Sequence, residues 1–251
     1  MNEWVGMDST IRIPVDGTFN LREPAGYPAA HGVTRSGVLY RSDGLKGLTD
    51  RGRAQLVELG VHTIIDLRDD FEREVQPDAL DDLEVEAVHI PVYEGSAAAN
   101  SGPGITLPTM YESIVFEHGK VVVSALRLIA SPDSGAVLVH CTAGKDRTGI
   151  VIALVLRAVG VATDVVVADY ALSEANLAGE WLESMISLIS RFGIADTPQL
   201  RGIMGSTPAE VMAGLLEHID EKFGSVTEYL LAHGFSSEEL EQLDAKLVRA
   251  A

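Results

Sequence analysis

The chain has 251 residues, of which 46% are hydrophobic, and it carries a formal net charge of −18 at pH 7. This length and apolar content suit one sizeable core, so we expect residues 1–251 to form a single domain. Nucleic acids and anionic membranes are bound through clustered Lys and Arg, and the acidic composition argues against both as partners. No apolar stretch reaches the roughly 18 residues of a membrane span, and no basic, apolar leader begins the chain. The sequence therefore predicts a cytoplasmic protein without stable membrane insertion.

Short apolar runs rich in β-branched residues predict four strands, at 37–41, 61–67, 86–92 and 136–140. Helical patterns lie between and after them, at 52–59, 108–129, 148–159, 163–172, 177–192, 208–222, 226–233 and 236–248. Ser/Thr-x-x-Glu patterns at Thr207 and Ser236 predict two capping boxes. A solvated face is expected from a run of acidic residues: Asp69, Asp70, Asp78, Asp81, Asp82, Glu84 and Glu86. The alternation predicts an α/β fold, with a central, mostly parallel sheet of about four to five strands flanked by helices and extra helices at the C-terminal end.

Ten consecutive residues, HCTAGKDRTG at 140–149, carry the clearest functional signal. They lie where an apolar strand ends and a helix begins, so the N–H groups of the turn and the positive end of the helix dipole favour an anion there. The same groups stabilise a thiolate, which makes Cys141, the only cysteine, a candidate nucleophile rather than an inert core residue. Six residues later, Arg147 can present its planar guanidinium to two phosphate oxygens. The segment predicts a phosphate-binding loop.

The other residues of this segment have supporting roles in the prediction. The Thr148 hydroxyl can hydrogen-bond to the thiolate, and His140 is expected to orient the loop backbone. Lys145 either adds a second cation at the rim of the pocket or tunes the thiolate. A nucleotide-binding P-loop is excluded, because Lys145 is followed by Asp146 rather than by Ser or Thr. The backbone amides expected around the phosphate are those of Thr142, Ala143, Gly144, Lys145, Asp146 and Arg147.

The Cys-x5-Arg signature resembles that of the protein tyrosine phosphatase superfamily, and HCTAGKDRTG is similar to the signature of its atypical bacterial branch. Weaker similarities extend the resemblance over about residues 18–248, at Phe19–Arg22, Leu39–Ser42, Ile65–Arg68 and, in the C-terminal helical element, Phe223–Val226 with Tyr229-Leu230. The resemblance implies a tyrosine-phosphatase-like fold, with Arg41 and Ser42 as supporting residues. It also implies hydrolysis of phosphomonoesters through a cysteinyl-phosphate, with inorganic phosphate as a product.

The substrate implied by the resemblance is phosphotyrosine in proteins, with phosphoinositides or dual and triple protein specificity as alternatives. No cofactor and no metal are expected, because no close pair of metal-ligating His or Cys occurs beyond His140-Cys141. Two further classes use comparable features: a catalytically silent phosphopeptide-binding module and a rhodanese-like sulfur transferase. Intact Cys141, Arg147 and Thr148 argue against the first, and Arg147 with the Lys145-Asp146 pair argues against the second.

The departing oxygen needs a proton, and two aspartates are candidate catalytic residues for its donor. Asp66 ends a predicted strand, and the carboxyl ends of parallel strands meet at one edge of a sheet, near Cys141. Asp146 lies within the loop itself. Either carboxylate could instead be structural, Asp66 by pairing with Arg41 or Arg68. The sequence favours Asp66 slightly and leaves both open.

Residues 176–206 contain an apolar stripe at helical spacing, formed by Trp181, Met185, Ile186 and Ile189. Such a stripe usually packs into a core. The family resemblance implies a helical lid over the pocket, so we expect this segment to be that lid.

Overall fold

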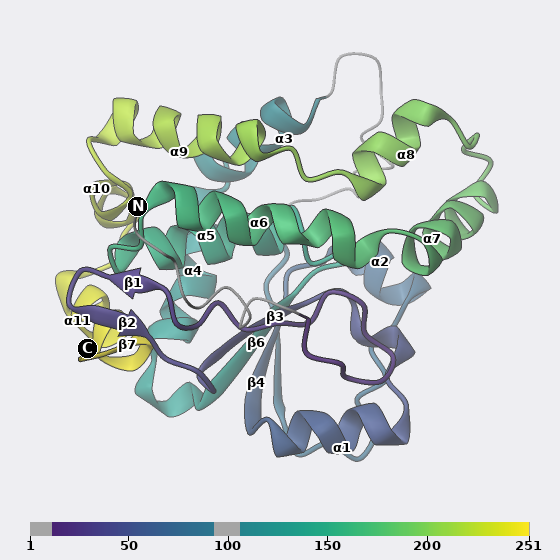
Figure 1. Cartoon of the computed structure of the whole chain (residues 1–251), viewed down its shortest axis with the longest axis horizontal. Helices are drawn as coiled ribbons and strands as arrows, with labels where there is room; N and C mark the ends of the chain where they lie inside the picture. Colours follow the sequence, from purple (N-terminus) through teal and green to yellow (C-terminus); the bar gives the residue numbers. More distant parts are fainter. Residues whose placement is uncertain (1–11, 93–105, 251) are drawn as a thin grey trace, which may run out of the picture.

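The computed structural model describes residues 12–92 and 106–250. At its centre lies a four-stranded parallel sheet in the order β3-β6-β4-β5 (Figure 1). Its strands are β3 (Leu39–Ser42), β4 (Val61–Asp66), β5 (Glu86–His89) and β6 (Ala136–His140). All three ladders are parallel, so the strands end along one edge, where His140 pairs with both Ser42 and Asp66. The predicted strands and the parallel α/β class are confirmed.

The sheet separates two apolar cores, because successive side chains of a strand point to opposite faces. On one face, Ile64 and Leu138 pack with Leu56 of α1 (Asp50–Glu58). On the other face, Ile65 and Val139 pack into a larger core built with helices. Those helices are α3 (Leu107–Phe116), α4 (Gly119–Ala130), α5 (Arg147–Ala158), α6 (Thr163–Leu177), α9 (Ala209–Phe223), α10 (Val226–Ala232) and α11 (Ser237–Leu247). The expected helices on both faces, and those at the C-terminal end, are present.

Helix α5 is apolar around its whole circumference, and residues 150–156 are all buried. A helix of this composition belongs inside a protein. It contacts β3 and β6 on one side and α6 on the other, and α9 packs against α6 (Figure 1). The burial of α5 between sheet and outer helices fixes the position of its first turn, and with it the loop that connects β6 to α5.

The helical pattern predicted at 108–129 forms two helices rather than one. Helix α3 ends at Phe116, and α4 begins at Gly119 beside His233. A Cβ at Gly119 would lie 2.5 Å from the imidazole of His233, so a larger residue there would have to displace this ring. The break at Glu117 and His118 was not distinguished from the surrounding helical pattern, and the prediction of one long helix is wrong.

The two predicted capping boxes have different outcomes. At Ser236 the box is formed, with the hydroxyl accepting from the Glu239 N–H and the Glu239 carboxylate accepting from the Ser236 N–H. At Thr207 it is not formed, because the hydroxyl donates to the Ala171 carbonyl of α6 instead. Tertiary contacts therefore override the local pattern at Thr207.

Several elements were not predicted. Helix α2 (Asp70–Val75) begins within the acidic run at 69–86, and its N-cap residue Asp69 is buried, as is most of the Asp78 side chain. The description of the whole run as a solvated face is therefore wrong at these two positions. A small antiparallel sheet, also unpredicted, has the order β1-β2-β7. Its strands are β1 (Pro28–Ala29), β2 (Gly32–Thr34) and β7 (Val248–Arg249).

The segment between α6 and α9 forms α7 (Glu180–Ser190) and α8 (Pro198–Gly205), and two short 3₁₀ turns lie at Leu45–Gly47 and Pro132–Ser134. In Figure 1, α7 and α8 lie together at the same end of the molecule as α2. Among the described residues, no helix combines the length and apolar character needed to cross a membrane.

Candidate active site

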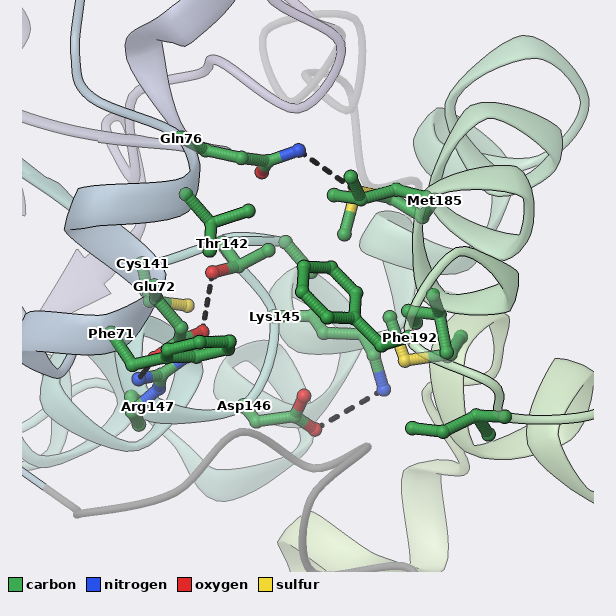
Figure 2. Close-up of a pocket in the computed structure, with 16 residues that line it drawn as sticks. Phe71, Glu72, Gln76, Cys141, Thr142, Lys145, Asp146, Arg147, Met185 and Phe192 are labelled. Carbon is green, nitrogen blue, oxygen red and sulfur yellow. Dashed lines mark hydrogen bonds and ion pairs between the residues drawn. The ribbon is translucent and has the colours of Figure 1, made fainter.

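The loop between β6 and α5, residues 141–146, forms the floor of a cavity of about 270 Å³. Cys141, at 2% exposure, follows the last residue of the central strand β6, and Arg147 is the first residue of α5. The cavity is lined by Cys141, Thr142, Ala143, Lys145, Asp146 and Arg147 from the loop region (Figure 2). The structure thus brings the residues of the predicted phosphate-binding loop to one cavity at the N-terminus of a buried helix.

Gly144 allows the loop to press against the end of β3. Its φ is +66°, and a Cβ there would lie 2.2 Å from the carbonyl oxygen of Ser42, so only glycine fits. The Arg41 guanidinium donates from Nη2 to the Gly144 carbonyl at 2.8 Å, and the Asn20 amide donates to the Ala143 carbonyl at 2.9 Å. Arg41 and Ser42 therefore support the loop from behind, through its backbone.

A buried carboxylate holds Arg41 in this position. Asp169 of α6 pairs with Nη1 of Arg41 through one oxygen and with Nε of Arg22, at 3.3 Å, through the other. Burial alone would raise the pKa of Asp169, but the two guanidinium groups lower it below its usual value. Burial and the neighbouring Arg41 charge lower the pKa of Arg22 to about 10. Sequence reasoning missed Asp169, which has no local motif that marks it.

Arg147 is held by Glu72 of α2, a residue that sequence reasoning also missed. The Glu72 carboxylate accepts from Nη1 of Arg147 at 2.5 Å and from Nη2 at 2.7 Å, and it accepts from the Thr142 hydroxyl at 2.5 Å. A third contact of Arg147, from Nη1 to the Leu67 carbonyl, is longer at 3.5 Å. A guanidinium has five N–H groups, and no described residue accepts from Nε or from the second N–H of Nη2. Those two donors lie on one side of the fork, where they can bind two oxygens of a phosphate.

The ion pair between Glu72 and Arg147 keeps both side chains charged. Burial would raise the pKa of Glu72, but the Arg147 charge and the hydrogen bonds from Arg147 and Thr142 lower it. Burial likewise disfavours a charged Arg147, but the Glu72 carboxylate raises its pKa above the usual value. An Asp-x-x-Glu pattern, Asp69 to Glu72, forms the capping box at the start of α2. That pattern could have indicated the helix, but not the partner of Glu72.

Lys145 does not act as a free cation at the rim. The residue is 1% exposed, and its amine donates to the Ile203 carbonyl at 2.8 Å, the Ser206 carbonyl at 3.0 Å and Oδ1 of Asp146 at 3.2 Å. An ammonium group has three N–H donors, so all of them are used. Lys145 lines the cavity but is buried rather than free at the rim, so the prediction of a rim cation is wrong in placing its donors at the disposal of a substrate.

Asp66 lies outside the cavity. Its carboxylate accepts from Nε and Nη2 of Arg68, both at 2.8 Å, and from the Arg68 N–H at 3.0 Å. Burial would raise the pKa of Asp66, but these bonds and the neighbouring His140 and Arg68 charges hold it well below its usual value. A carboxylate held ionised and away from Cys141 is a poor proton donor, so the preference for Asp66 over Asp146 is corrected. Its pairing with Arg68 is the structural role that the sequence offered as the alternative to proton donation.

Asp146 remains as the candidate acid within reach of the loop. It lines the cavity together with Cys141 and Arg147. Its Oδ1 accepts from the hydroxyl of Tyr111 at 2.6 Å and from Lys145. Tyr111 has no signal in the sequence that connects it to the loop.

His140 and Thr148 flank the loop from the interior. The imidazole of His140 places Nε2 3.3 Å from Asp78 and 4.0 Å from Asp66, and Nδ1 lies 3.3 Å from the Cys141 carbonyl. Burial would lower the pKa of His140, but the two carboxylates raise it. The Thr148 hydroxyl is buried and has no hydrogen-bond partner among the described residues, so the predicted bond to the sulfur is not formed here.

One cluster has the composition of a metal site: Asp66, Asp78 and His140 lie within 4.8 Å of one another. The Arg68 guanidinium, however, donates from Nη2 to both carboxylates, at 2.8 and 2.7 Å. The arginine occupies the position between the carboxylates that a cation would take. These residues therefore fit an ion-pair network better than a metal site.

Apart from Glu72 and Gln76, the remaining walls of the cavity are apolar and come mostly from α7, α8 and the turn between them. We call residues 180–205 the α7–α8 cover. Trp181, Met185 and Met204 of the cover pack in one apolar cluster with Ala143 of the loop. At the mouth, the exposed ring of Phe192 meets Phe71 of α2 edge to face, with ring centroids 5.8 Å apart (Figure 2). The apolar lining residues are Phe71, Val75, Met185, Leu188, Ile189, Phe192, Ile194 and Met204.

The sequence matches a protein family and several relatives. The model of the tyrosine phosphatase family matches residues 13–249. The chain is 32% identical over 266 residues to the triple specificity protein phosphatase PtpB of Mycobacterium tuberculosis, covering 88% of this chain and 93% of that protein. It is 32% identical over 230 residues to a tyrosine-protein phosphatase of Nostoc commune, covering 85% and 75%. Among solved structures, P. aeruginosa TpbA in complex with pTyr is 22% identical, with a TM-score of 0.37 over 73% of this chain and 98% of that one.

Proposed function

Because the chain belongs to the tyrosine phosphatase family, we propose that it hydrolyses phosphotyrosine in proteins through a cysteinyl-phosphate on Cys141. The observation that carries the proposal is the single cavity lined by Cys141, Arg147 and Asp146 at the N-terminus of α5. Such a place favours an anion, because the first turn of a helix presents unpaired N–H groups and positive potential. A nucleophile, an anion clamp and an acid are thereby close to one bound phosphate.

In the first step, the Cys141 thiolate attacks phosphorus in line with the leaving oxygen. The S–P bond forms, the P–O bond to tyrosine breaks, and Asp146 gives its proton to the departing phenolate oxygen. The free donors of Arg147 and the loop amides bind the other phosphate oxygens. Fixed donors of this kind stabilise the transition state without reorganising, which is usually the largest contribution to catalysis.

In the second step, water attacks the cysteinyl-phosphate. The new O–P bond forms as the S–P bond breaks, and Asp146, now a carboxylate, takes a proton from the water. Inorganic phosphate leaves, and both the thiolate of Cys141 and the protonated acid are restored. Glu72 holds Arg147 in the same place through both steps by its two hydrogen bonds.

The walls of the cavity support a phosphate ester of an aromatic alcohol. Outside the loop, eight apolar side chains line it, including Phe71 and Phe192 at the mouth. An aromatic ring gains free energy from leaving water for such a surface. A phosphorylated inositol is polyanionic and needs several cations, but Lys145 is used by three acceptors within the protein. Phosphotyrosine is therefore the favoured substrate class, and a phosphoinositide is the alternative that the cavity favours less.

The decisive experiment measures phosphate release from an aryl phosphate in the presence of a metal chelator. We expect turnover by the wild type and none by Cys141→Ser, whose oxygen nucleophile is far weaker at neutral pH. No turnover by the wild type, or equal turnover by the variant, would overturn the proposal. If the wild type binds a phosphotyrosine peptide without turning it over, the protein is a silent binding module. Sulfur transfer from thiosulfate to cyanide would identify a rhodanese.

A second experiment determines the substrate class. Equal concentrations of a phosphotyrosine peptide, the same peptide with phosphoserine, and a short-chain phosphoinositide are offered to the wild type. We expect kcat/KM to be highest for phosphotyrosine, and a preference for the phosphoinositide would contradict the argument from Lys145. A cytoplasmic place of action stays a prediction from the sequence.

A further inference from the structure

Two buried tyrosines lie beneath Asp146 and have no part in the chemistry described so far. Tyr111 comes from α3 and Tyr170 from α6, with exposures of 0% and 1%. The Tyr111 hydroxyl lies 2.6 Å from Oδ1 of Asp146 and 2.8 Å from the Tyr170 hydroxyl. The two rings meet edge to face, with centroids 6.2 Å apart. A chain of two phenols therefore ends on the candidate acid.

The direction of these hydrogen bonds follows from the number of protons. A phenol has one O–H, and Oδ1 of Asp146 can only accept, both in the ionised carboxylate and when the acid proton is on Oδ2. Tyr111 therefore donates its proton to Asp146, and Tyr170 donates its own to the Tyr111 oxygen. Burial, and then the Asp146 carboxylate, raises the pKa of Tyr111 well above its usual value and raises that of Tyr170 as well. Both phenols stay protonated and act as donors at neutral pH, and hydrogen bonds in such a chain strengthen one another.

All of these contacts use one oxygen of Asp146. Tyr111 and Lys145 both donate to Oδ1, and no described residue donates to Oδ2. In Figure 2 the dashed line from Lys145 ends on one oxygen of Asp146, and no dashed line reaches the other. Because Asp146 lines the cavity, Oδ2 is the oxygen left to exchange a proton with a bound substrate or water. Two donors at fixed positions also set the plane of the carboxyl group.

We infer that Tyr111, supported by Tyr170, is a positioning residue for the acid–base chemistry of Asp146. It holds Oδ1 so that Oδ2 gives a proton to the leaving oxygen in the first step and takes one from water in the second. The inference rests on the proposed phosphatase function. It goes beyond that function because it assigns a role to a hydroxyl group that touches neither the phosphate nor Cys141.

The alternative is that Tyr111 only fills the core between α3 and α6. The two roles predict different losses of activity in Tyr111→Phe when the leaving group of the substrate is varied. A poor leaving group such as phenolate needs the proton in the transition state, whereas 2,4-dinitrophenolate leaves without one. A positioning role predicts a loss that grows with the basicity of the leaving group. A packing role predicts the same loss for every substrate, because the whole cavity would be disturbed.

The test measures kcat/KM for phenyl phosphate and for 2,4-dinitrophenyl phosphate, because kcat/KM reports the steps up to formation of the cysteinyl-phosphate. General acid catalysis is worth about 10²–10⁴-fold, and we expect Tyr111→Phe to lose about tenfold on phenyl phosphate and less than about twofold on the dinitrophenyl ester. Tyr170→Phe should show the same selectivity with a loss of about threefold. Tyr229→Phe is the matched control, since Tyr229 is equally buried but donates to the Val115 carbonyl in the core.

Equal losses on the two esters, or no loss on either, in Tyr111→Phe would overturn the inference. If Tyr111→Phe does not fold, Tyr170→Phe carries the test with the same criteria. Leaving-group selectivity in Tyr229→Phe would also overturn it, because the effect would then follow from general loosening of the core. Failure of the proposed function is distinguishable, because the wild type would then turn over neither ester.

Discussion

The loop at 141–146 and the α7–α8 cover face each other across one cavity, but different interactions hold them. The loop is fixed by directional bonds from buried charged and amide groups, such as Arg41 to the Gly144 carbonyl and Asn20 to the Ala143 carbonyl. The cover is held by apolar packing around Trp181 and by the amine of Lys145. Hydrogen bonds require one geometry, whereas apolar contacts are non-directional. The comparison predicts a rigid phosphate site beneath a cover that can open at lower cost.

The largest expected effect is on the loop side, from Arg147→Lys. A lysine amine cannot bond Glu72 twice and also offer two parallel N–H groups to phosphate. Loss of a single transition-state donor costs about 10²–10³-fold in kcat, so we expect kcat/KM for an aryl phosphate to fall by about 10³. The matched control is Arg201→Lys on the exposed surface of the cover, where ion pairs with Glu183 and Asp196 are open to solvent. Similar losses in both variants would contradict the comparison.

The next largest effect is expected from Glu72→Gln, which keeps the charge of Arg147 but weakens the bonds that hold it in position. In Glu72→Gln the amide can accept one bond from Arg147 but no longer neutralises it. Removing one partner of a buried ion pair costs about 3 kcal/mol or more, so unfolding in urea should show a loss of that order. We expect kcat/KM to fall less than in Arg147→Lys, because the guanidinium remains. The control is the exposed Glu183→Gln, and unchanged stability in Glu72→Gln would show that the pair is not needed.

The parts of the site that the sequence could predict are those whose residues lie close together along the chain. Cys141, Gly144 and Arg147 lie within one segment, and their chemistry follows from a strand, a turn and a helix in order. Glu72 reaches Arg147 across 75 positions, and Tyr111 reaches Asp146 across 35. No local pattern connects such pairs, so they could be found only from the fold.

Asp66 shows a different limit of sequence reasoning. Its place at the carboxyl edge of the sheet, beside His140, was predicted correctly. Which way its side chain turns is decided by Arg68, two residues later, which binds it outside the cavity. Lys145 was misjudged for a related reason: its acceptors, the carbonyls of Ile203 and Ser206, lie at the C-terminal end of α8, a helix that was not predicted. The position of a residue along a strand follows from the nearby sequence, whereas the partner of its charged side chain depends on the tertiary fold.

A smaller effect tests the cover. In the wild type we expect amide hydrogen exchange to be faster in α7 and α8 than in β4 and β6, and equal protection would contradict the lid prediction for residues 176–206.

In Lys145→Met the bonds to the Ile203 and Ser206 carbonyls are lost. A hydrogen bond from a charged group is worth about 1.5 kcal/mol or more, so exchange in α8 should rise by about tenfold while the sheet is unchanged. Lys246→Met is the matched control, because Lys246 donates to the Ser131 carbonyl away from the cover.

The smallest expected effect is a pH dependence of stability on the loop side, from His140. The carboxylates of Asp78 and Asp66 raise its pKa in the folded protein, against the effect of burial and the Arg68 charge. A raised folded-state pKa means that the protonated imidazole stabilises the fold. This contribution is fully present below about pH 6.5, the unfolded value, and is lost as the pH rises through the folded-state value.

We therefore expect the free energy of unfolding, measured in urea between about pH 6 and pH 9, to fall more steeply in the wild type than in His140→Gln, which cannot titrate. His218→Gln is the control, since that imidazole pairs with Glu112 on the surface, where solvent weakens the interaction. Parallel curves for the wild type and His140→Gln would show that His140 is neutral beside Cys141. The positive charge next to the loop would then come from Arg41, Lys145 and Arg147 rather than from this imidazole.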